Sequence, residues 1–434
     1  MDKVRIGLCG LGTVGAGTVN VLRRNRDEIC ARAGCDIEIV HICTRSDKPD
    51  VDVAGIKVSR DIFDVARDPN VDIVLELIGG TTTALELVRT AIGHGKHVVT
   101  ANKALIAEHG NELMAEATAA GVSIAFEAAV AGGIPIIKSL REGLSGNRIE
   151  WLAGIINGTG NFILTEMSEK GRDFADVLAE AQALGYAEAD PTFDVEGIDA
   201  AHKLVILAAI AFGMPLQFDK VYIEGISRLE SQDVDYAAEL GYRIKHLGIA
   251  RRAGGGVEMR VHPTLIPESR LLANVNGVKN AVLVEGDAVG PTLYYGAGAG
   301  AEPTASAVLA DVVDLARDMA CGQSPSVAVL GGAEGSEVPD IVPIENVNCA
   351  WYLRLHAEDK PGVMSNVARI LSDAGISIEA LIQKQPAAAV SHVPIIILTN
   401  QALGATVDAA CAQLEALPTV IDAVTRLRVE SLDG

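Results

Sequence analysis

Short apolar runs and helical patterns alternate over the first part of the chain. Residues 4–9, 37–43, 71–78, 97–99 and 122–126 are rich in Val, Ile and Leu and are bounded by turn residues, which is typical of buried strands. The stretches between them carry apolar residues at helical spacing. Strands that alternate with helices in this way predict a mostly parallel sheet that binds ligands at the carboxyl ends of its strands.

The pattern changes after residue 135. Residues 136–144 predict a helix that leads out of the parallel sheet, and alternating apolar and polar positions at 257–261 and 282–285 predict further strands. These strands would form a mixed sheet that could also carry a subunit interface. We therefore predict a second, α+β domain over residues 136–300.

The C-terminal part has an order of elements of its own. A run rich in Gly, Pro, Ser and acidic residues predicts a linker over residues 326–345. Strand patterns follow at 351–356, 376–382, 393–398 and 420–429, and helical patterns lie at 363–374 and 407–416. The order βαββαβ predicts a small separate module over residues 346–434.

A glycine-rich turn joins the first predicted strand to the first predicted helix. It reads Gly10-Leu11-Gly12-Thr13-Val14-Gly15. In this context Gly10 makes the tight turn, Gly12 lets the backbone approach a pyrophosphate, and Gly15 lets the helix pack on the strand. The N–H groups at the start of the helix would face the phosphates. We therefore predict a Rossmann-type NAD(P)-binding domain over residues 1–135; the alternative is a glycine-rich turn without a ligand.

The end of the second predicted strand bears on the choice of cofactor. An NAD site usually has Asp or Glu there, which binds the ribose 2′-hydroxyl. This chain reads Thr44-Arg45-Ser46 instead, and Asp36 lies at the wrong end of the strand. Because Arg45 could pair with a 2′-phosphate, we predict that NADP(H) is preferred and that NAD(H) is possible. The alternative is that Arg45 is an ordinary exposed loop residue.

The stretch 181–203, AQALGYAEADPTFDVEGIDAAHK, gathers acidic residues beside a lysine. It runs into LVILAAIAF, which predicts a helix that is buried on all sides. Asp199 and Lys203 are one helical turn apart and share a face of that helix. The lysine is a candidate acid–base group, because burial lowers a lysine pKa and a neighbouring carboxylate raises it. On spacing alone, an exposed ion pair is the alternative.

Charge and composition narrow the possible partners. The net charge is −21, and so acidic a chain repels nucleic acid and anionic membrane surfaces, so we expect neither as a partner. No window of about 18 residues is apolar throughout, and the start lacks a signal-peptide pattern. Seven scattered cysteines without a CxxC pair indicate reduced thiols, not disulfides or a zinc site. We therefore expect a cytoplasmic protein.

Four stretches of the sequence resemble homoserine dehydrogenases. Residues 181–203 match the family pattern A-x3-G-Y-x-E-x-D-P-x2-D-V-x-G-x-D-x3-K, and the runs TANKALIA, EAAVAGGIP and NGTGNFILTEM are similar too. With the C-terminal module described below, the resemblance covers nearly the whole chain. It implies reversible, NAD(P)H-dependent reduction of L-aspartate 4-semialdehyde to L-homoserine in threonine, methionine and isoleucine biosynthesis.

The resemblance implies roles for four charged residues. Lys203 would handle the proton, and Lys103, which follows the predicted strand at 97–99, would be a second catalytic lysine beside cofactor and substrate. Glu188 and Asp199 would bind the substrate ammonium or orient its hydroxyl. Residues 136–300 would therefore form a substrate-binding, catalytic and dimerisation domain.

Two turns gain a role from the same resemblance. Residues 157–161 read as an Asn-Gly turn, and Thr159 within it would be a secondary substrate contact. A carboxylate followed by a glycine-rich backbone can offer several oxygens to one cation, and the family has a sodium site in the corresponding run. The residues implied for that site are Glu127, Val130, Gly132 and Ile134.

The cofactor site implied by the resemblance draws on several segments. The loop at 294–304 would return to the cofactor domain, which residues of about 300–325 would complete. The residues implied for cofactor binding are Gly10, Gly12, Thr13, Val14, Gly15, Arg45, Thr100, Lys103, Gly185 and Gly300.

The C-terminal module has a resemblance of its own. The run LRLHAEDKPGVMSNVARILSDAGISIEAL at 353–381 resembles an ACT domain. Such modules bind small amino acids in the turn before the first helix, often between paired copies. The resemblance therefore implies L-threonine as a feedback effector and a homodimer or homotetramer; a dimerisation module without a ligand is the alternative.

Two rival functions are less compatible with the residues. Aspartate-semialdehyde dehydrogenase chemistry needs a nucleophilic cysteine, and the chain has no cysteine between Cys43 and Cys321. A sensor of NADP and amino acids that has lost catalysis would not need both Lys103 and Lys203. A turnover assay separates this sensor from an enzyme.

Overall fold

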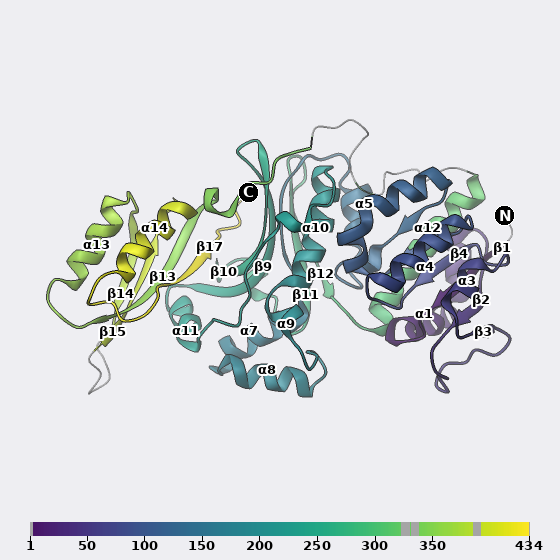
Figure 1. Ribbon diagram of the computed structural model, residues 1–434, viewed down its shortest axis with the longest axis horizontal. Helices are drawn as coiled ribbons and strands as arrows, with labels where there is room; N and C mark the ends of the chain where they lie inside the picture. The colour runs from purple at the N-terminus through teal and green to yellow at the C-terminus, as the bar shows by residue number, and fades with distance from the viewer. Residues whose placement is uncertain (1–2, 323–329, 331–337, 385–391, 434) are drawn as a thin grey trace. The chain divides into compact units, whose positions relative to one another are not determined.

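The computed structural model (Figure 1) describes residues 3–322, 330, 338–384 and 392–433. The chain divides into two compact units. Unit 1 consists of Met1–Gly158, Asp199–Val221 and Val278–Pro339, and unit 2 consists of Thr159–Ile198, Tyr222–Gly277 and Asp340–Gly434. Residues 136–300, predicted as one domain, are therefore shared between the two units. Most of the predicted linker at 326–345 lies outside the described residues.

The parallel sheet of unit 1 confirms the predicted Rossmann-type fold. Its strands are β1 (Lys3–Cys9), β2 (Asp36–Cys43), β3 (Lys57–Ser59), β4 (Ile73–Glu76), β5 (His97–Thr100) and β6 (Ile124–Ala125). The order β3-β2-β1-β4-β5-β6 is the one in which dinucleotides bind outside the carboxyl ends of the strands, where the winding direction reverses. That reversal lies between β1 and β4.

Helices pack on this sheet. They are α1 (Thr13–Arg24), α2 (Arg26–Ala33), α3 (Ile62–Arg67), α4 (Thr82–Gly93), α5 (Lys103–Ala120) and α12 (Ala301–Cys321). The late helix α12 lies against α1, and its Val308 and Val312 share one core with Ile6 and Ile37. The segment after residue 300 thus packs on the cofactor sheet.

The rest of unit 1 is antiparallel and helical. Strands β7 (Ile149–Ile155), β11 (Lys279–Gly286) and β12 (Gly290–Ala297) pair antiparallel, and the helical segments are η1 (Glu127–Ala129), α6 (Ile136–Lys138), η2 (Ser139–Gly143), α10 (Ile198–Phe212) and η3 (Phe218–Lys220). Helix α10 is buried nearly all round, as predicted. The predicted helix at 136–144 is one α-turn followed by a π-turn, because the N–H of Leu144 bonds the carbonyl of Ser139, five residues back, at 2.8 Å.

Unit 2 combines a helical layer with a long sheet. Outside the C-terminal module its elements are α7 (Gly158–Lys170), α8 (Phe174–Ala183), α9 (Thr192–Val195), β8 (Tyr222–Ile223), α11 (Ser231–Glu239), β9 (Tyr242–Ala253), β10 (Gly256–Pro267) and η4 (Leu271–Asn274). The predicted turn at 157–161 is wrong, because helix α7 begins at Gly158. Asn161 explains the early start, since its amide donates to the carbonyls of Val275 and Gly277 and fixes the first turn.

The C-terminal module has the predicted βαββαβ order, with one additional two-residue strand before its second helix. Its elements are η5 (Ile344–Asn346), β13 (Asn348–Glu358), α13 (Val363–Asp373), β14 (Ile378–Gln383), β15 (His392–Thr399), β16 (Ala402–Leu403), α14 (Gly404–Glu415) and β17 (Thr425–Val429). Strand β17 pairs antiparallel with β13 and parallel with β10, where Arg428 lies opposite Thr264. The module therefore shares one sheet with the rest of unit 2, in the order β9-β10-β17-β13-β15-β14.

A buried ion pair also joins the module to the rest of unit 2. The guanidinium of Arg354 in β13 donates to both carboxylate oxygens of Asp233 in α11, at 2.6 and 3.0 Å. The hydroxyl of Tyr352 donates to the same carboxylate at 3.0 Å. In the part of the chain that the structure describes, no helix has the length and apolar composition of a membrane span.

Candidate active site

The β1–α1 turn is closed on its protein side and open where a phosphate would approach. Gly10 has φ +101, and a Cβ atom there would lie 2.5 Å from the carbonyl oxygen of Leu77. A Cβ at Gly15 would lie 2.0 Å from the carbonyl oxygen of Gly10, whereas nothing lies within 4 Å of the position at Gly12. Thr13 begins α1, and its first turn carries no acidic residue. The turn therefore fits a dinucleotide pyrophosphate.

A buried carboxylate that the sequence reasoning missed shapes the same edge of the sheet. Glu76, fully buried at the end of β4, accepts hydrogen bonds from the N–H groups of Ile78 and Gly79 at 3.0 and 3.1 Å. It also accepts one from the hydroxyl of Thr100, at the end of β5, at 2.5 Å. An acidic residue that ends an otherwise apolar strand is the signal that could have found it. Glu76 thus fixes Thr100, three residues before Lys103.

Both predicted catalytic lysines contact one carboxylate. The ammonium of Lys103, the first residue of α5, lies 3.1 Å from Oδ1 of Asp199, and the ammonium of Lys203 lies 2.7 Å from Oδ2. The Asp199 side chain is 7% exposed, against 12% for Lys203 and 30% for Lys103. The i,i+4 pair is therefore buried, and the alternative of an exposed ion pair is excluded.

Two groups at the end of β7 complete this Lys103–Asp199–Lys203 cluster. The ammonium of Lys203 donates to the carbonyl of Ile156 at 2.7 Å, and the amide of Asn157 donates to Oδ2 of Asp199 at 2.9 Å. Sequence reasoning missed both groups. A backbone carbonyl carries no sequence signal, and Asn157 followed by Gly158 indicates only a turn.

The charge state of Asp199 follows from its surroundings. Burial raises the pKa of Asp199, but the charges of Lys203 and Lys103 and the hydrogen bonds from Lys203 and Asn157 outweigh it, so the pKa lies well below its ordinary value. The group is a carboxylate with an ammonium on each side. Such ammonium groups can donate a proton to a substrate oxygen and stabilise negative charge that develops on it.

A buried histidine next to the cluster stays neutral. Burial, followed by the charge of Lys103, lowers the pKa of His202 to about 4. Its ring packs on Phe218 with centroids 4.3 Å apart, and Nε2 lies 3.5 Å from Glu108. His202 adds no positive charge at neutral pH.

The remaining substrate candidates, Thr159 and Glu188, belong to unit 2, and so does the cofactor candidate Gly185. The hydroxyl of Thr159 donates to the carbonyl of Tyr186 at 2.7 Å and so ties the start of α7 to the loop that follows α8. In that loop Gly185 has φ +74, and the side chain of Glu188 is exposed. Thr159, Gly185 and Glu188 are thus brought into one local structure.

Arg45 lies just beyond β2, as predicted. It is exposed and has no hydrogen-bond or ion-pair partner among the residues that the structure describes. Arg60, which the sequence reasoning missed, donates to the carbonyl of Thr44 at 2.9 Å and pairs with Asp47. The guanidinium of Arg45 is therefore available where the ribose of a bound dinucleotide would lie, whereas that of Arg60 is held by Thr44 and Asp47.

The loop before α12 approaches α1 closely. Gly300 is the N-cap of α12, with φ +128. A Cβ at Gly17 would lie 2.4 Å from the carbonyl oxygen of Ala301, so no larger residue fits there. Gly300 is therefore held beside the helix that begins at the cofactor turn.

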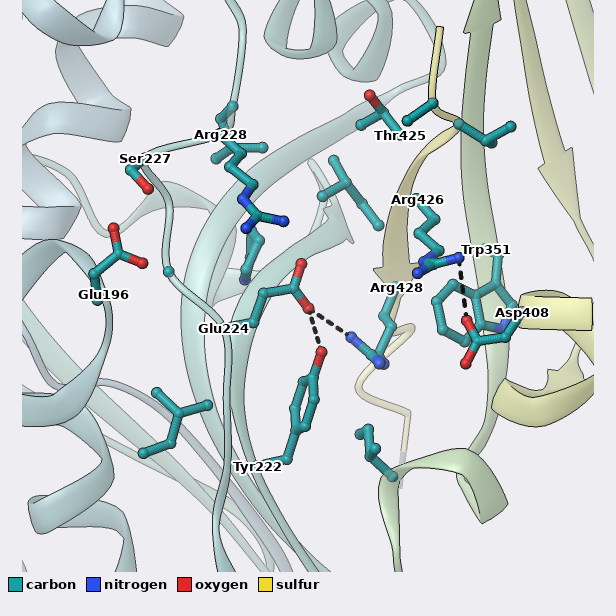
Figure 2. Close-up of a pocket in the computed structure, with 18 of the residues that line it drawn as sticks. Glu196, Tyr222, Glu224, Ser227, Arg228, Trp351, Asp408, Thr425, Arg426 and Arg428 are labelled. Atoms are coloured by element: carbon teal, nitrogen blue, oxygen red, sulfur yellow. Dashed lines mark hydrogen bonds and ion pairs between the residues drawn. The ribbon is translucent and has the colours of Figure 1, made fainter. Parts of the chain in front are cut away.

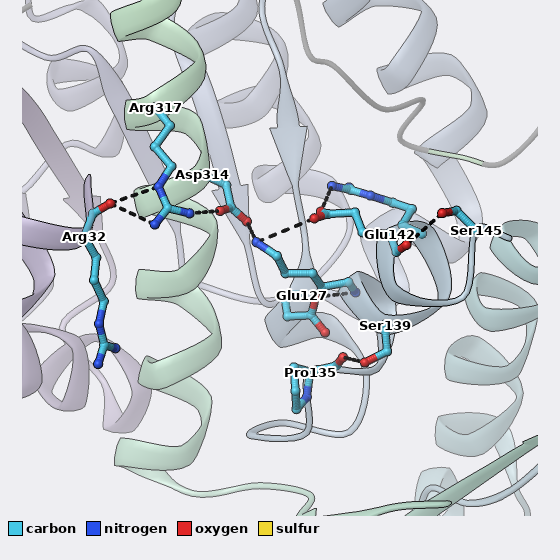
Figure 3. Close-up of polar contacts among 10 residues, drawn as sticks. Arg32, Glu127, Pro135, Ser139, Glu142, Ser145, Asp314 and Arg317 are labelled. Carbon is cyan, nitrogen blue, oxygen red and sulfur yellow. Dashed lines mark hydrogen bonds and ion pairs between the residues drawn. The ribbon is translucent and has the colours of Figure 1, made fainter. Parts of the chain in front are cut away.

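The predicted cation site has a carboxylate that is already engaged by backbone. Glu127 accepts hydrogen bonds from the N–H groups of Ile137 and Lys138 at 2.9 and 2.7 Å and so caps α6, next to the ion pairs around Asp314 (Figure 3). Burial raises the pKa of Glu127 to about 7 despite those bonds. Burial, and then the charge of Glu127, raises the pKa of Asp311, which accepts the N–H of Glu127 at 2.8 Å.

The backbone after Glu127 takes an uncommon path. Ala131 and Gly132 have consecutive positive φ angles of 55° and 54°, which non-glycine residues rarely adopt. The carbonyl of Ile134 accepts the N–H of Ile136 at 2.8 Å. Among the described residues no group of three or more His, Cys, Asp or Glu side chains could hold a metal. A cation here would therefore use Glu127 and carbonyls such as those of Val130, Gly132 and Ile134.

Together, the strand order, the glycine turn and the paired lysines define an oxidoreductase that uses a nicotinamide dinucleotide. Family models described as "Homoserine dehydrogenase, NAD binding domain" and "Homoserine dehydrogenase" match residues 10–127 and 135–313, and "AHAS small subunit-like ACT domain" matches residues 353–422. The chain belongs to the homoserine dehydrogenase family and is an NAD(P)-dependent oxidoreductase with a C-terminal ACT-like domain.

Similar proteins match most or all of the chain. A homoserine dehydrogenase from Pseudomonas aeruginosa is 62% identical and covers 100% of both chains. The crystal structure of one from Thiobacillus denitrificans is 59% identical, covers 100% of this chain and 99% of that chain, and has a TM-score of 0.94. A hyperthermophilic archaeal homoserine dehydrogenase, solved in complex with NADPH, is 27% identical, covers 72% of this chain and 97% of its own, and has a TM-score of 0.61.

Proposed function

We propose that the Lys103–Asp199–Lys203 cluster carries the proton transfer of homoserine dehydrogenase chemistry in this chain. The reaction interconverts L-aspartate 4-semialdehyde and L-homoserine. The bound nicotinamide supplies the hydride to the aldehyde carbon or accepts it from the alcohol carbon. The carbonyl oxygen then needs a proton, and an ammonium group within hydrogen-bond reach delivers it.

Lys203 is the principal proton donor in this proposal. Its ammonium is held by the carbonyl of Ile156 and by Asp199, both at 2.7 Å, so its position is well defined. Lys103 starts α5 at the carboxyl end of β5, which is the edge where the nicotinamide binds. We therefore assign Lys103 to the oxygen that develops negative charge, beside cofactor and substrate.

Asp199 positions the lysines, and Glu188 recognises the substrate. The carboxylate of Asp199 contacts Lys103, Lys203 and Asn157, which favours orienting these donors over binding the substrate ammonium directly. Glu188 is an exposed carboxylate without a side-chain partner among the described residues. Thr159 supports it indirectly by fixing the loop at Tyr186.

The cofactor preference follows from Arg45 and the neighbouring Arg60. Beyond β2, where the strand ends without an Asp or Glu, the guanidinium of Arg45 is unpaired among the described residues, which favours a 2′-phosphate and therefore NADP(H), with NAD(H) possible. Arg60, which follows β3 and pairs with Asp47, lies beside it. The similar archaeal enzyme, solved with NADPH, supports this choice. The turn at Gly12 and Thr13, with the side chain of Thr100 and the loop at Gly300, completes the proposed cofactor site.

A monovalent cation, Na⁺ in this proposal, fits the turn after Glu127. Burial raises the pKa of Glu127 and of Asp311, which means that ionising these carboxyl groups is unfavourable. A nearby cation would stabilise their ionised forms. Val130, Gly132 and Ile134 supply carbonyl oxygens in an irregular backbone, the kind of ligand that hard cations prefer.

Regulation and assembly follow from the ACT-like domain. We propose that L-threonine is the effector and that the chain forms a homodimer or homotetramer in the cytoplasm. The edge strand β12, partly exposed along its whole length, is compatible with a subunit interface.

The observation that carries the proposal is the contact of one buried carboxylate with two lysines. The test is homoserine-dependent NADP reduction at alkaline pH, repeated with NAD and with added L-threonine. Turnover that is faster with NADP and slowed by threonine is expected. Folded protein that turns over with neither cofactor would contradict the catalytic proposal, whereas an unchanged rate with threonine would contradict only the effector.

A further inference from the structure

A chain of hydrogen bonds runs from the buried carboxylate of Glu76 to the start of α5. The hydroxyl of Thr100 donates to Oε2 of Glu76 at 2.5 Å, and the N–H of Asn102 donates to the hydroxyl oxygen of Thr100 at 2.9 Å. Asn102 is the N-cap of α5, where its side chain accepts the N–H of Leu105 at 3.2 Å. Lys103 therefore follows a residue that is fixed through both its backbone and its side chain.

The other oxygen of Glu76 holds the turn that follows β4. Oε1 accepts the N–H groups of Ile78 and Gly79 at 3.0 and 3.1 Å. The amide of Asn102 donates to the carbonyl of Gly80 at 2.6 Å and so ties this turn to the start of α5. Both glycines are exposed and have positive φ angles of 72° and 76°. The carboxyl ends of β4 and β5 are thereby joined into one frame, at the edge of the sheet where a dinucleotide binds.

The ion pairs around a pocket in unit 2 offer a contrast to Glu76. That pocket has a volume of about 610 Å³ and lies beside the strand pair β10–β17 (Figure 2). There Glu224 pairs with Arg428 at 3.0 Å and Asp408 pairs with Arg426 at 3.3 Å, and both carboxylates are partly exposed. Glu76 is fully buried, yet in the part of the chain that the structure describes its hydrogen bonds come from neutral donors alone.

The chemistry of these donors explains why position 76 needs a carboxylate. Burying a charge without a counter-charge is unfavourable, so an amide of the same size would be less costly unless the position requires acceptors only. A glutamine could turn its NH₂ group toward Thr100, whose hydroxyl proton would then lose its acceptor. It could otherwise turn that group toward the N–H groups of Ile78 and Gly79, where donor would face donor. Either orientation breaks the network at one end.

We propose that Glu76 and Asn102 are positioning residues for Lys103. They fix the start of α5 and so hold the lysine ammonium 3.1 Å from Oδ1 of Asp199. The inference rests on the proposed function, in which Lys103 stabilises the oxygen that develops negative charge. Because a displacement of about 1 Å in such a group can lower the rate about 10²-fold, a residue that contacts no substrate can still set the rate.

A double-mutant cycle tests whether Glu76 acts through Lys103. We expect Lys103→Ala to lower kcat about 10²- to 10³-fold, as the loss of a donor at a developing oxyanion does, and Glu76→Gln to lower it about 10- to 100-fold. In Glu76→Gln the KM for homoserine should stay within about threefold, because the weakened interaction forms only in the transition state. The double variant should match the kcat of Lys103→Ala within about threefold, whereas independent effects would multiply.

A second set of variants separates positioning from helix stability. Asn102→Ala removes the cap of α5, and the matched control Asp61→Ala removes the side-chain cap of α3. Both should lower the melting temperature, because a lost cap destabilises a helix. We expect only Asn102→Ala to lower kcat about tenfold or more, while Asp61→Ala keeps it within about twofold. Asn102→Ser, which keeps a capping oxygen but loses the bond to Gly80, should recover part of kcat.

Several outcomes would overturn the inference. If Lys103→Ala loses kcat as expected but Glu76→Gln keeps it within about twofold, the inference fails while the proposed function stands. If Glu76→Gln lowers kcat equally with and without Lys103, Glu76 acts independently of that lysine. If Glu76→Gln does not fold, equal kcat values in Asn102→Ala and Asp61→Ala decide against the inference. More than about a tenth of wild-type kcat in Lys103→Ala would contradict the proposed role of Lys103, and the inference with it.

Discussion

Each unit contains a buried cluster in which a carboxylate is paired with cationic side chains. The two clusters differ in the kind of cation. In unit 1 the carboxylate of Asp199 holds two lysines that remain 12% and 30% exposed. In unit 2 the carboxylate of Asp233 is fully buried and holds the fork of Arg354, which is 3% exposed. An ammonium is a compact proton donor, whereas a guanidinium stays protonated and binds a carboxylate with two parallel bonds. The first cluster therefore suits the proton transfer that we propose for it, and the second suits the stability of unit 2.

The largest effect should come from removing the lysine of the first cluster. We expect Lys203→Ala to lower kcat by about 10²- to 10⁴-fold, the usual contribution of a general acid–base group, while the dissociation constant of NADP stays within about twofold. Steady-state kinetics and cofactor titration check this, and Lys220→Ala, at an exposed lysine of the same unit, is the control. More than about a tenth of wild-type kcat would remove Lys203 from the mechanism.

The matching change in the second cluster should affect stability and not chemistry. Arg354→Ala leaves the carboxylate of Asp233 buried without its partner, which should lower the free energy of unfolding of unit 2 by about 3–5 kcal/mol. Urea unfolding followed by fluorescence measures it, with Arg369→Ala, at an exposed arginine on α13, as the control. A large loss of kcat in folded Arg354→Ala protein would show that the second cluster also contributes to catalysis.

Acid should lower the stability of the fold around the first cluster, because His202 is buried there as a neutral imidazole. Its pKa of about 4, below the ordinary 6.5, means that the unfolded chain takes up the proton more readily. Stability is therefore lost as pH falls from 6.5 toward 4, by about 2 kcal/mol at pH 5 relative to pH 8. Unfolding of His202→Gln should lack this component, whereas His94→Gln, at an exposed histidine, should keep it. Equal pH dependence in both variants would show that His202 is not buried neutral.

The smallest effect should come from Arg45, an exposed cation that belongs to neither cluster. Arg45→Ser should raise KM for NADP about fivefold and leave KM for NAD unchanged, because an exposed ion pair with a 2′-phosphate contributes little more than about 1 kcal/mol. Initial rates with both cofactors measure it, and Arg67→Ser is the control. A parallel change in both KM values would place Arg45 outside the 2′-phosphate site.

Local patterns predicted those parts of the fold that depend on short stretches. The strand, glycine turn and helix at 4–24 could be read from neighbouring residues, and so could the buried helix that starts at Ile198. The spacing of Asp199 and Lys203 placed them on one helix face. It could not show that the pair is buried, because that depends on β7 bringing Ile156 and Asn157 to the same point.

The missed features depend on contacts between distant segments. Glu76 gains its partners from the turn after β4 and from β5. Helix α7 begins earlier than predicted because Asn161 bonds carbonyls more than a hundred residues away. The pocket in unit 2 exists only where β17 returns to β10, and no stretch of sequence announces that pairing.

The parallel pairing of β17 with β10 has a consequence for how the chain is made. Because Thr264 meets Arg428, the sheet of unit 2 cannot close until synthesis has passed residue 429. Its formation is therefore a late, high-contact-order event, and such events slow folding. The ACT-like domain is therefore not an independent module that could be removed from the chain. Exchanging it between relatives would have to carry β10 along, or leave an open sheet edge where the native chain has none.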